Sequence, residues 1–148
     1  MKKLLPVLAL ALAFAACTKT ESVSMRTAKI TKGKWYQSEA IVSRVNQPDT
    51  DLIGLVFPSI RDNKYMFMPN GDFVTLEGPT KLFAQLPDSA ATAKWEFKFA
   101  DTKIRIYNDT SSAEFDITRF DDSSMVWRKS NTENGITSFS SVTYHRTN

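Results

Sequence analysis

The sequence predicts an all-β fold, an eight-stranded antiparallel up-and-down β-barrel. Several short segments alternate strictly between apolar and polar residues, and such alternation marks a strand with one buried face. Turn-forming residues separate these segments, and no convincing helical pattern lies between most of them. Many short strands at close spacing favour a meander closed into a barrel over a two-layer sandwich.

The first element along the chain is an N-terminal signal segment, residues 1–16. Two lysines precede the apolar run 4–16, which is shorter than the roughly 20 residues that span a bilayer. Two alanines lead directly into Cys17, and this junction resembles the lipobox of bacterial lipoproteins. The resemblance implies a lipid on Cys17 and an anchor in the outer membrane, with the domain on the periplasmic or cell-surface side. An ordinary signal with a chance cysteine is the alternative.

Residues 17–30 are polar without a sustained period, so we expect a lipidated flexible tether, with the barrel domain at 31–148. Without residues 1–16, 17 basic residues stand against 16 acidic ones, which leaves a net charge of +1. Nucleic-acid binding is not indicated, because it usually shows as a clustered basic patch.

The alternation of apolar and polar residues defines the bounds of the predicted strands. In the clearest, KWEFKF at 94–99, Trp95, Phe97 and Phe99 share one face. The predicted strands are 35–44, 64–68, 73–77, 93–99, 103–107, 113–120, 125–129 and 136–146. The segments PNGD, ADT, NDTSS, DDSS and NTENG provide turns between them.

An up-and-down order places the connections alternately at the two ends of the barrel. Both long connections, 45–63 and 78–92, then fall at one end, which we call the open end. The short turns PNGD, ADT and DDSS fall at the opposite, closed end, where the first strand also begins. Long loops on a rigid scaffold commonly carry the binding site, so the open end is the expected working end.

An eight-stranded barrel is just wide enough to be filled by its own side chains or to hold one small ligand. The residues expected to face inward, and therefore the candidates for ligand contact, are Gln37, Glu39, Trp95, Phe97, Phe99, Ile104, Ile106, Phe115, Ile117, Arg119 and Trp127. Gln37, Glu39 and Arg119 would need a polar partner or a polar ligand group there. A bulge in the first strand would remove Glu39 from the inside.

The first long connection contains an unusually apolar segment, DLIGLVFPSI at 51–60. One interpretation is a lid over a cavity or a contact surface for another protein, formed by Leu52, Ile53, Leu55, Val56 and Phe57. The other interpretation is a loop folded back onto the barrel rim as additional core, since exposed apolar patches are a liability.

The first strand opens as G-x-W at Gly33 and Trp35, and KYMFMPNGDFV at 64–74 is a phenylalanine-bearing strand that turns through a glycine. With these motifs the chain, over roughly 31–148, resembles the lipocalin-like domain of bacterial lipoproteins. The resemblance implies an eight-stranded barrel and binding of a small apolar molecule. The strand order also places Arg146 beside Trp35 at the closed end, and in such barrels a late arginine often covers the first tryptophan.

The residue inventory provides no support for catalysis, a metal or another cofactor. His145 is the only histidine, and Cys17 is the expected lipid site, so the usual zinc ligands are lacking. No nucleophile-elbow motif appears. Two non-enzymatic functions therefore remain, a barrel that binds a small apolar ligand and a filled barrel whose loops contact another protein.

Overall fold

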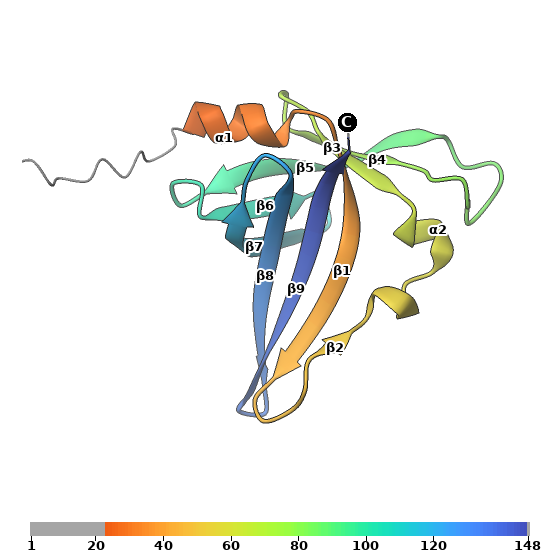
Figure 1. Cartoon of the computed structure of the whole chain (residues 1–148). Helices are drawn as coiled ribbons and strands as arrows, with labels where there is room; N and C mark the ends of the chain where they lie inside the picture. The colour runs from red at the N-terminus through yellow and green to blue at the C-terminus, as the bar shows by residue number, and fades with distance from the viewer. Residues whose placement is uncertain (1–22, 148) are drawn as a thin grey trace, which may run out of the picture.

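Strands β1 and β3–β9 close into an antiparallel barrel in the computed structural model, which describes residues 23–147 (Figure 1). Neighbours follow chain order from β3 to β9, and β1 pairs with both β3 and β9. The strands are β1 Lys34–Arg44, β2 Thr50–Asp51, β3 Lys64–Phe67, β4 Asp72–Leu76, β5 Ser89–Lys98, β6 Lys103–Tyr107, β7 Ser112–Phe120, β8 Ser124–Glu133 and β9 Ile136–Thr147. The predicted fold class is confirmed, and the short β2 is an addition at one edge of β1.

The strands separate toward the open end of the barrel. β1 pairs with β3 only through Trp35 and Tyr36, and β8 pairs with β7 only as far as Arg128. Beyond these points β8, β9 and β1 continue as a ribbon, which Figure 1 shows extending away from the other strands with β2 along its β1 edge. The barrel is therefore tight at the closed end and wide at the open end.

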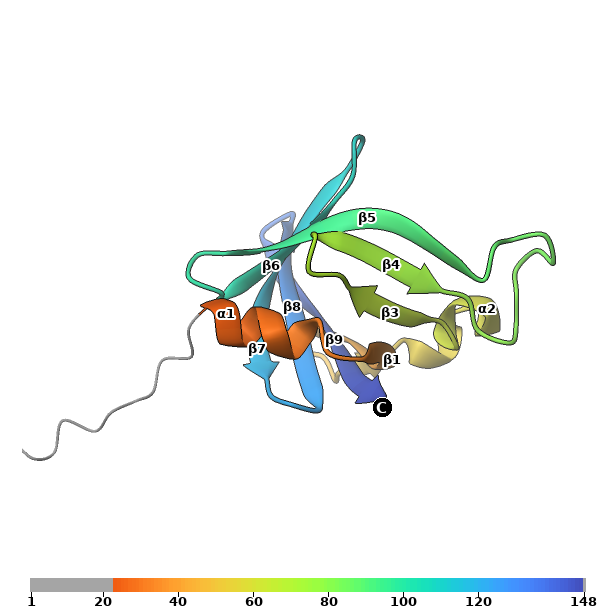
Figure 2. The ribbon, with the colours of Figure 1, turned by 90° about the horizontal axis from the view of Figure 1, so that it is seen from above.

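Helix α1, Val23–Ile30, occupies a segment that the sequence predicts as tether, and this prediction is wrong for residues 23–30. The helix packs at the closed end, where Arg26 donates to the carbonyl of Asp101 and Lys29 pairs with Asp122 at 3.5 Å. Ile30 is fully buried in the core. An isolated helix of this length is marginal, so these tertiary contacts stabilise it. In Figure 2 α1 passes in front of β7.

Aromatic side chains dominate the core. Phe67 packs edge-on against Trp95, with ring centroids 5.5 Å apart, and against Trp127 at 5.8 Å. Trp35, Ile104 and Met125 complete the fully buried centre. Tilted and edge-to-face arrangements are favourable for aromatic rings. The rings packed in this way fill the closed half of the barrel.

The predicted pairing of Trp35 and Arg146 is present. The two residues are register partners in β1 and β9, and the Arg146 guanidinium carbon lies 5.9 Å from the centre of the Trp35 ring. The Trp35 indole also donates to the carbonyl of Ile30 at 2.9 Å. Gly33 has φ +88°, and a Cβ there would lie 3.2 Å from the Arg146 side chain, so glycine permits the close approach.

Two bulges turn predicted inward residues outward. The register of β1 shifts between Gln37 and Glu39, so Glu39 is exposed and accepts a hydrogen bond from the Thr143 hydroxyl at 2.9 Å. A second shift, in β7 after Ile117, leaves Arg119 exposed and hydrogen-bonded to Asp121. Each extra residue reverses the alternation beyond it, and the inward predictions for Glu39 and Arg119 are wrong for this reason.

Phe99 is also outside the barrel, with 68% of its surface exposed. β5 ends at Lys98, and Phe99, Ala100 and Asp101 all have positive φ in the turn to β6. The turn therefore begins one residue earlier than the alternation predicts, and Phe99 does not face inward.

The predicted signal segment 1–16, Cys17 and tether residues 18–22 lie outside the described residues. Within residues 23–147, no helix has the length and apolar character needed to cross a membrane.

Candidate functional site

A hollow of about 360 Å³ lies at the open end of the barrel, above the filled core. Its apolar walls come from seven strands and include Tyr65, Phe73, Ile106, Phe115, Trp127 and Tyr144. The volume falls at the low end of the range of about 300 to 1,000 Å³ that is usual for ligand pockets. We define this hollow as the aromatic hollow.

The walls of the aromatic hollow are rings held against one another. Trp127 stacks near Phe115, with centroids 5.4 Å apart, and lies 4.6 Å from the ring of Tyr144. Tyr65 stacks on Phe73 at 5.5 Å and meets Tyr144 edge-on at 5.9 Å. Because each ring is fixed by another, the shape of the hollow is set before any ligand enters.

The rim of the aromatic hollow is polar and ordered. The turn between β6 and β7 contributes Asn108, whose side-chain oxygen accepts hydrogen bonds from the backbone N–H groups of Thr110 at 3.0 Å and Ser111 at 2.8 Å. The asparagine at the start of NDTSS thus forms a local turn, as the sequence predicts. An ordered polar rim around apolar walls is typical of a site for a small, mostly apolar molecule.

Two polar groups in the walls have no protein partner. Trp127 is 4% exposed, and its indole N–H makes no hydrogen bond within the described residues. Tyr144 is 8% exposed, and its hydroxyl also has no hydrogen-bond partner in residues 23–147. An unpaired buried donor costs about 1–3 kcal/mol, and this cost applies to the Trp127 N–H. The Tyr144 hydroxyl, in the wall of the hollow, is available to donate to a ligand.

Both phenol groups remain protonated in this environment. Burial raises the pKa of Tyr144 well above its usual value, and the neighbouring Tyr65 adds to the shift. Burial also raises the pKa of Tyr65, with a smaller contribution from the Glu77 carboxylate. The hollow therefore presents neutral hydroxyl groups at physiological pH.

The predicted interior residues divide into three groups. Ile106, Phe115 and Trp127 line the aromatic hollow. Trp95, Phe97, Ile104 and Ile117 pack in or against the core of the closed half. Gln37 is the register partner of Tyr144 and is half-buried, but it does not line the hollow. Glu39, Phe99 and Arg119 face outward.

The sequence analysis missed Tyr65, Phe73 and Tyr144 as site residues. The alternation contained a signal for two of them, because Tyr65 alternates with Phe67 and Tyr144 with Val142. A bulge between β4 and β5 falls next to Phe73 and is not visible in the sequence.

The predicted mouth loop does not contribute to the aromatic hollow. It forms a 3₁₀ helix, η1 Ile53–Leu55, and the short helix α2 Pro58–Arg61 beside β1. None of Leu52, Ile53, Leu55, Val56 and Phe57 lines the hollow, so the lid interpretation is wrong for this conformation. Leu55 and Phe57 are 79% and 69% exposed, while the other three are half-buried, so only part of the loop folds back as core.

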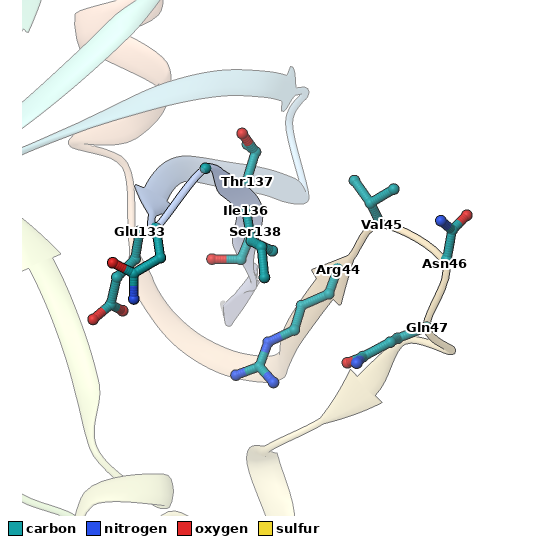
Figure 3. Close-up of a pocket in the computed structure, with 10 residues that line it drawn as sticks. Arg44, Val45, Asn46, Gln47, Glu133, Ile136, Thr137 and Ser138 are labelled. Atoms are coloured by element: carbon teal, nitrogen blue, oxygen red, sulfur yellow. The ribbon is translucent and has the colours of Figure 1, made fainter.

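A larger hollow of about 590 Å³ lies at the tip of the ribbon, between the turn after β1 and the hairpin of β8 and β9 (Figure 3). Arg44, Gln47, Glu133 and Ser138 give it a polar lining. Val45 and Ile136 there are more than half exposed. Because its walls are strand ends and turns without a buried residue or a ring, we consider the smaller aromatic hollow the better candidate site.

No protein-family model matches the chain, and no curated protein is significantly similar to it. The assignment of a function therefore depends on the geometry of the barrel and its aromatic hollow.

Proposed function

We propose that this protein is a membrane-anchored, lipocalin-like lipoprotein that binds a small apolar molecule in the aromatic hollow. Cys17 carries the lipid that anchors it to the outer membrane, on the periplasmic or cell-surface side. The chain acts as a carrier or receptor of its ligand and not as an enzyme.

The observation that carries the proposal is the aromatic hollow itself, a preformed space at the open end of an otherwise filled barrel. Its buried walls leave two hydrogen-bond donors, the Trp127 indole and the Tyr144 hydroxyl, without partners in the described part of the chain. A packed core without a ligand would be expected to fill this space and to satisfy these groups.

Filling the hollow tests the proposal. Ala93 lines the hollow and Ala91, on the same strand, is exposed, so Ala93→Leu and Ala91→Leu form a matched pair. The probe is N-phenyl-1-naphthylamine, a neutral apolar fluorophore, titrated into the full-length chain carrying Cys17→Ala. Ala93→Leu should weaken probe binding about tenfold or more, while Ala91→Leu should leave it unchanged. Equal binding by both folded variants would contradict a site in the hollow.

A second candidate function is a protein contact through the loops at the open end. Besides Leu55 and Phe57, the connection between β4 and β5 exposes more than half of Leu82 and Phe83. Asp62 accepts a hydrogen bond from the Thr80 N–H at 2.8 Å, and Asn63 accepts one from the Gly78 N–H at 2.9 Å. These bonds hold the two apolar loops against each other in one arrangement, which favours a contact surface.

The double variant Leu55→Asp with Phe57→Asp tests this second function. Because both side chains are largely exposed, the thermal transition should stay unchanged, while cross-linking to a partner in intact cells should decrease. A collapse of the thermal transition would show that the loop is core and would remove this candidate.

A further inference from the structure

The side chains that line the aromatic hollow are all neutral, and this limits the charge of its ligand. The walls are hydrocarbon and aromatic surface, and the polar rim consists of amide and hydroxyl groups. No lysine, arginine, histidine, aspartate or glutamate lines the hollow. An ion placed there would lose its hydration without gaining an opposite charge, so a neutral ligand is favoured.

The three tryptophans of the chain differ in how their indole N–H groups are satisfied. Trp35 donates to the carbonyl of Ile30 at 2.9 Å, and Trp95 donates to the carbonyl of Met68 at 3.0 Å. Trp127 has no such carbonyl within the described residues, although its indole nitrogen is buried. A buried indole N–H normally finds a partner, and the exception in this chain is the tryptophan in the wall of the hollow.

A second unpaired donor lies beside the first. The Tyr144 ring centre is 4.6 Å from the Trp127 ring centre, and the Tyr144 hydroxyl makes no hydrogen bond in the described part of the chain. The raised pKa of Tyr144 keeps this hydroxyl protonated and able to donate. The hollow thus combines apolar walls with two neutral donors that have no protein partner in the described residues.

We propose that the ligand of the aromatic hollow is a neutral, mainly apolar molecule with one hydrogen-bond acceptor, such as a carbonyl oxygen, that receives a hydrogen bond from Trp127 or Tyr144. This inference rests on the proposed function, because it names the ligand class of the same site. It distinguishes such ligands from plain hydrocarbons, which would leave both donors unpaired.

The inference also distinguishes a neutral ligand from a carboxylate with the same skeleton. Lys129, two residues beyond Trp127 on β8, is exposed outside the lining of the hollow. Arg105 borders the rim, where it donates to the Ser112 hydroxyl at 2.8 Å, but its charge is already paired with Glu96 at 3.1 Å. A carboxylate would therefore have to leave its charge at the rim and could not reach the two buried donors without losing its hydration.

Three probes of nearly equal shape test the inference by NMR: acetophenone, cumene and benzoate. They present a neutral carbonyl, no acceptor and a carboxylate, respectively. The protein is the ¹⁵N-labelled full-length chain carrying Cys17→Ala, and Trp35 and Trp95 are internal controls because their N–H groups are already paired. Acetophenone and cumene should bind and benzoate should not. If Trp127 is the donor, only acetophenone should shift its indole N–H resonance downfield, and if Tyr144 is the donor, the Tyr144→Phe variant below detects the hydrogen bond.

Two variants measure how much each hydrogen bond contributes to the affinity for acetophenone. Trp127→Phe and Tyr144→Phe each remove one donor, and at least one of them should weaken acetophenone binding by about threefold to tenfold more than cumene binding. The comparison with cumene corrects for any change in the shape of the hollow.

The outcomes separate the inference from the proposed function. Binding of benzoate as tightly as acetophenone would overturn the inference, and so would variants that weaken acetophenone and cumene equally. In both of these cases the hollow still binds small molecules. If none of the three probes binds, the proposed function itself is wrong.

Discussion

At the scale of single residues, side chains at the closed end fix the barrel where the strands meet. The Arg146 guanidinium covers the Trp35 ring, and Gly33 leaves the space that the arginine side chain occupies. Neither residue of the cation–π pair lines the aromatic hollow. Their role is therefore structural, and changes there should affect stability without changing the site.

Arg146→Ala should lower the free energy of unfolding by about 0.5–2 kcal/mol, because a cation over a shielded indole is worth that much. Urea denaturation checks this value, and Arg128→Ala is the control, since the Arg128 guanidinium lies 3.9 Å from the ring centre of the half-buried ribbon residue Phe139. Arg128→Ala should lower the free energy of unfolding by less than Arg146→Ala does, because Arg128 is exposed. Equal losses in the two variants would contradict a special contribution from the closed-end pair.

A second residue-scale prediction concerns Asp121 in the turn between β7 and β8. Hydrogen bonds from the backbone of Ser123, and further ones from Arg119 and Ser124, hold its pKa well below the ordinary value of 3.8. Because the folded-state pKa is the lower one, this stabilisation is present above about pH 4 and is lost as the pH falls toward the folded value.

Asp121→Asn removes the ionisable group, so the free energy of unfolding should fall less steeply with acid in the variant than in the parent protein. Urea denaturation at a series of pH values between 2 and 6 measures the two slopes. If both proteins lose stability in parallel, the turn does not carry this part of the acid sensitivity.

At the scale of secondary structure, the element that differs most from expectation is α1. The sequence of residues 23–30 is polar enough to suggest a tether, yet Ile30 is fully buried and supplies the carbonyl that pairs with Trp35. The segment is thus part of the domain, which begins before residue 31, although the first barrel strand starts at Lys34.

Ile30→Ala should lower the free energy of unfolding by about 2–5 kcal/mol, because it leaves a cavity in a packed core. Met25→Ala on the same helix is the control and should have a small effect, since Met25 is exposed. The difference can be measured by thermal and urea unfolding. An Ile30→Ala variant as stable as Met25→Ala would restore the tether interpretation.

The alternation of the strands predicts all eight barrel strands and their order, because a period of two is a direct result of one buried face. It fails where a single extra residue is inserted, as before Glu39 and before Arg119, because a bulge depends on local backbone geometry and not on composition. The aromatic hollow was predicted only in part. Its position depends on where β7 separates from β8 and β1 from β3, which is a property of the closed barrel.

At the scale of the whole molecule, the barrel has a filled half and a hollow half. Helix α1 packs at the closed end, and the aromatic hollow lies toward the other end, so the proposed anchor on Cys17 would leave the hollow accessible. This arrangement suits a receptor or carrier that is tethered at one end and loaded at the other.

Cys17→Ala should release the protein from the membrane fraction, because the thiol is the proposed site of lipid attachment. Cell fractionation and incorporation of a labelled fatty acid measure the two effects. A variant that remains in the membrane fraction with its lipid label would show that the anchor lies elsewhere.

The central claim is that the aromatic hollow holds a small apolar ligand, and the most direct test is to identify what the protein carries. The full-length chain and its Ala93→Leu variant are purified from the same cells, extracted with organic solvent and compared by mass spectrometry. We expect a small, mainly apolar compound in stoichiometric amount from the parent protein and a large depletion of it from Ala93→Leu. Identical extracts from the two proteins would contradict the claim.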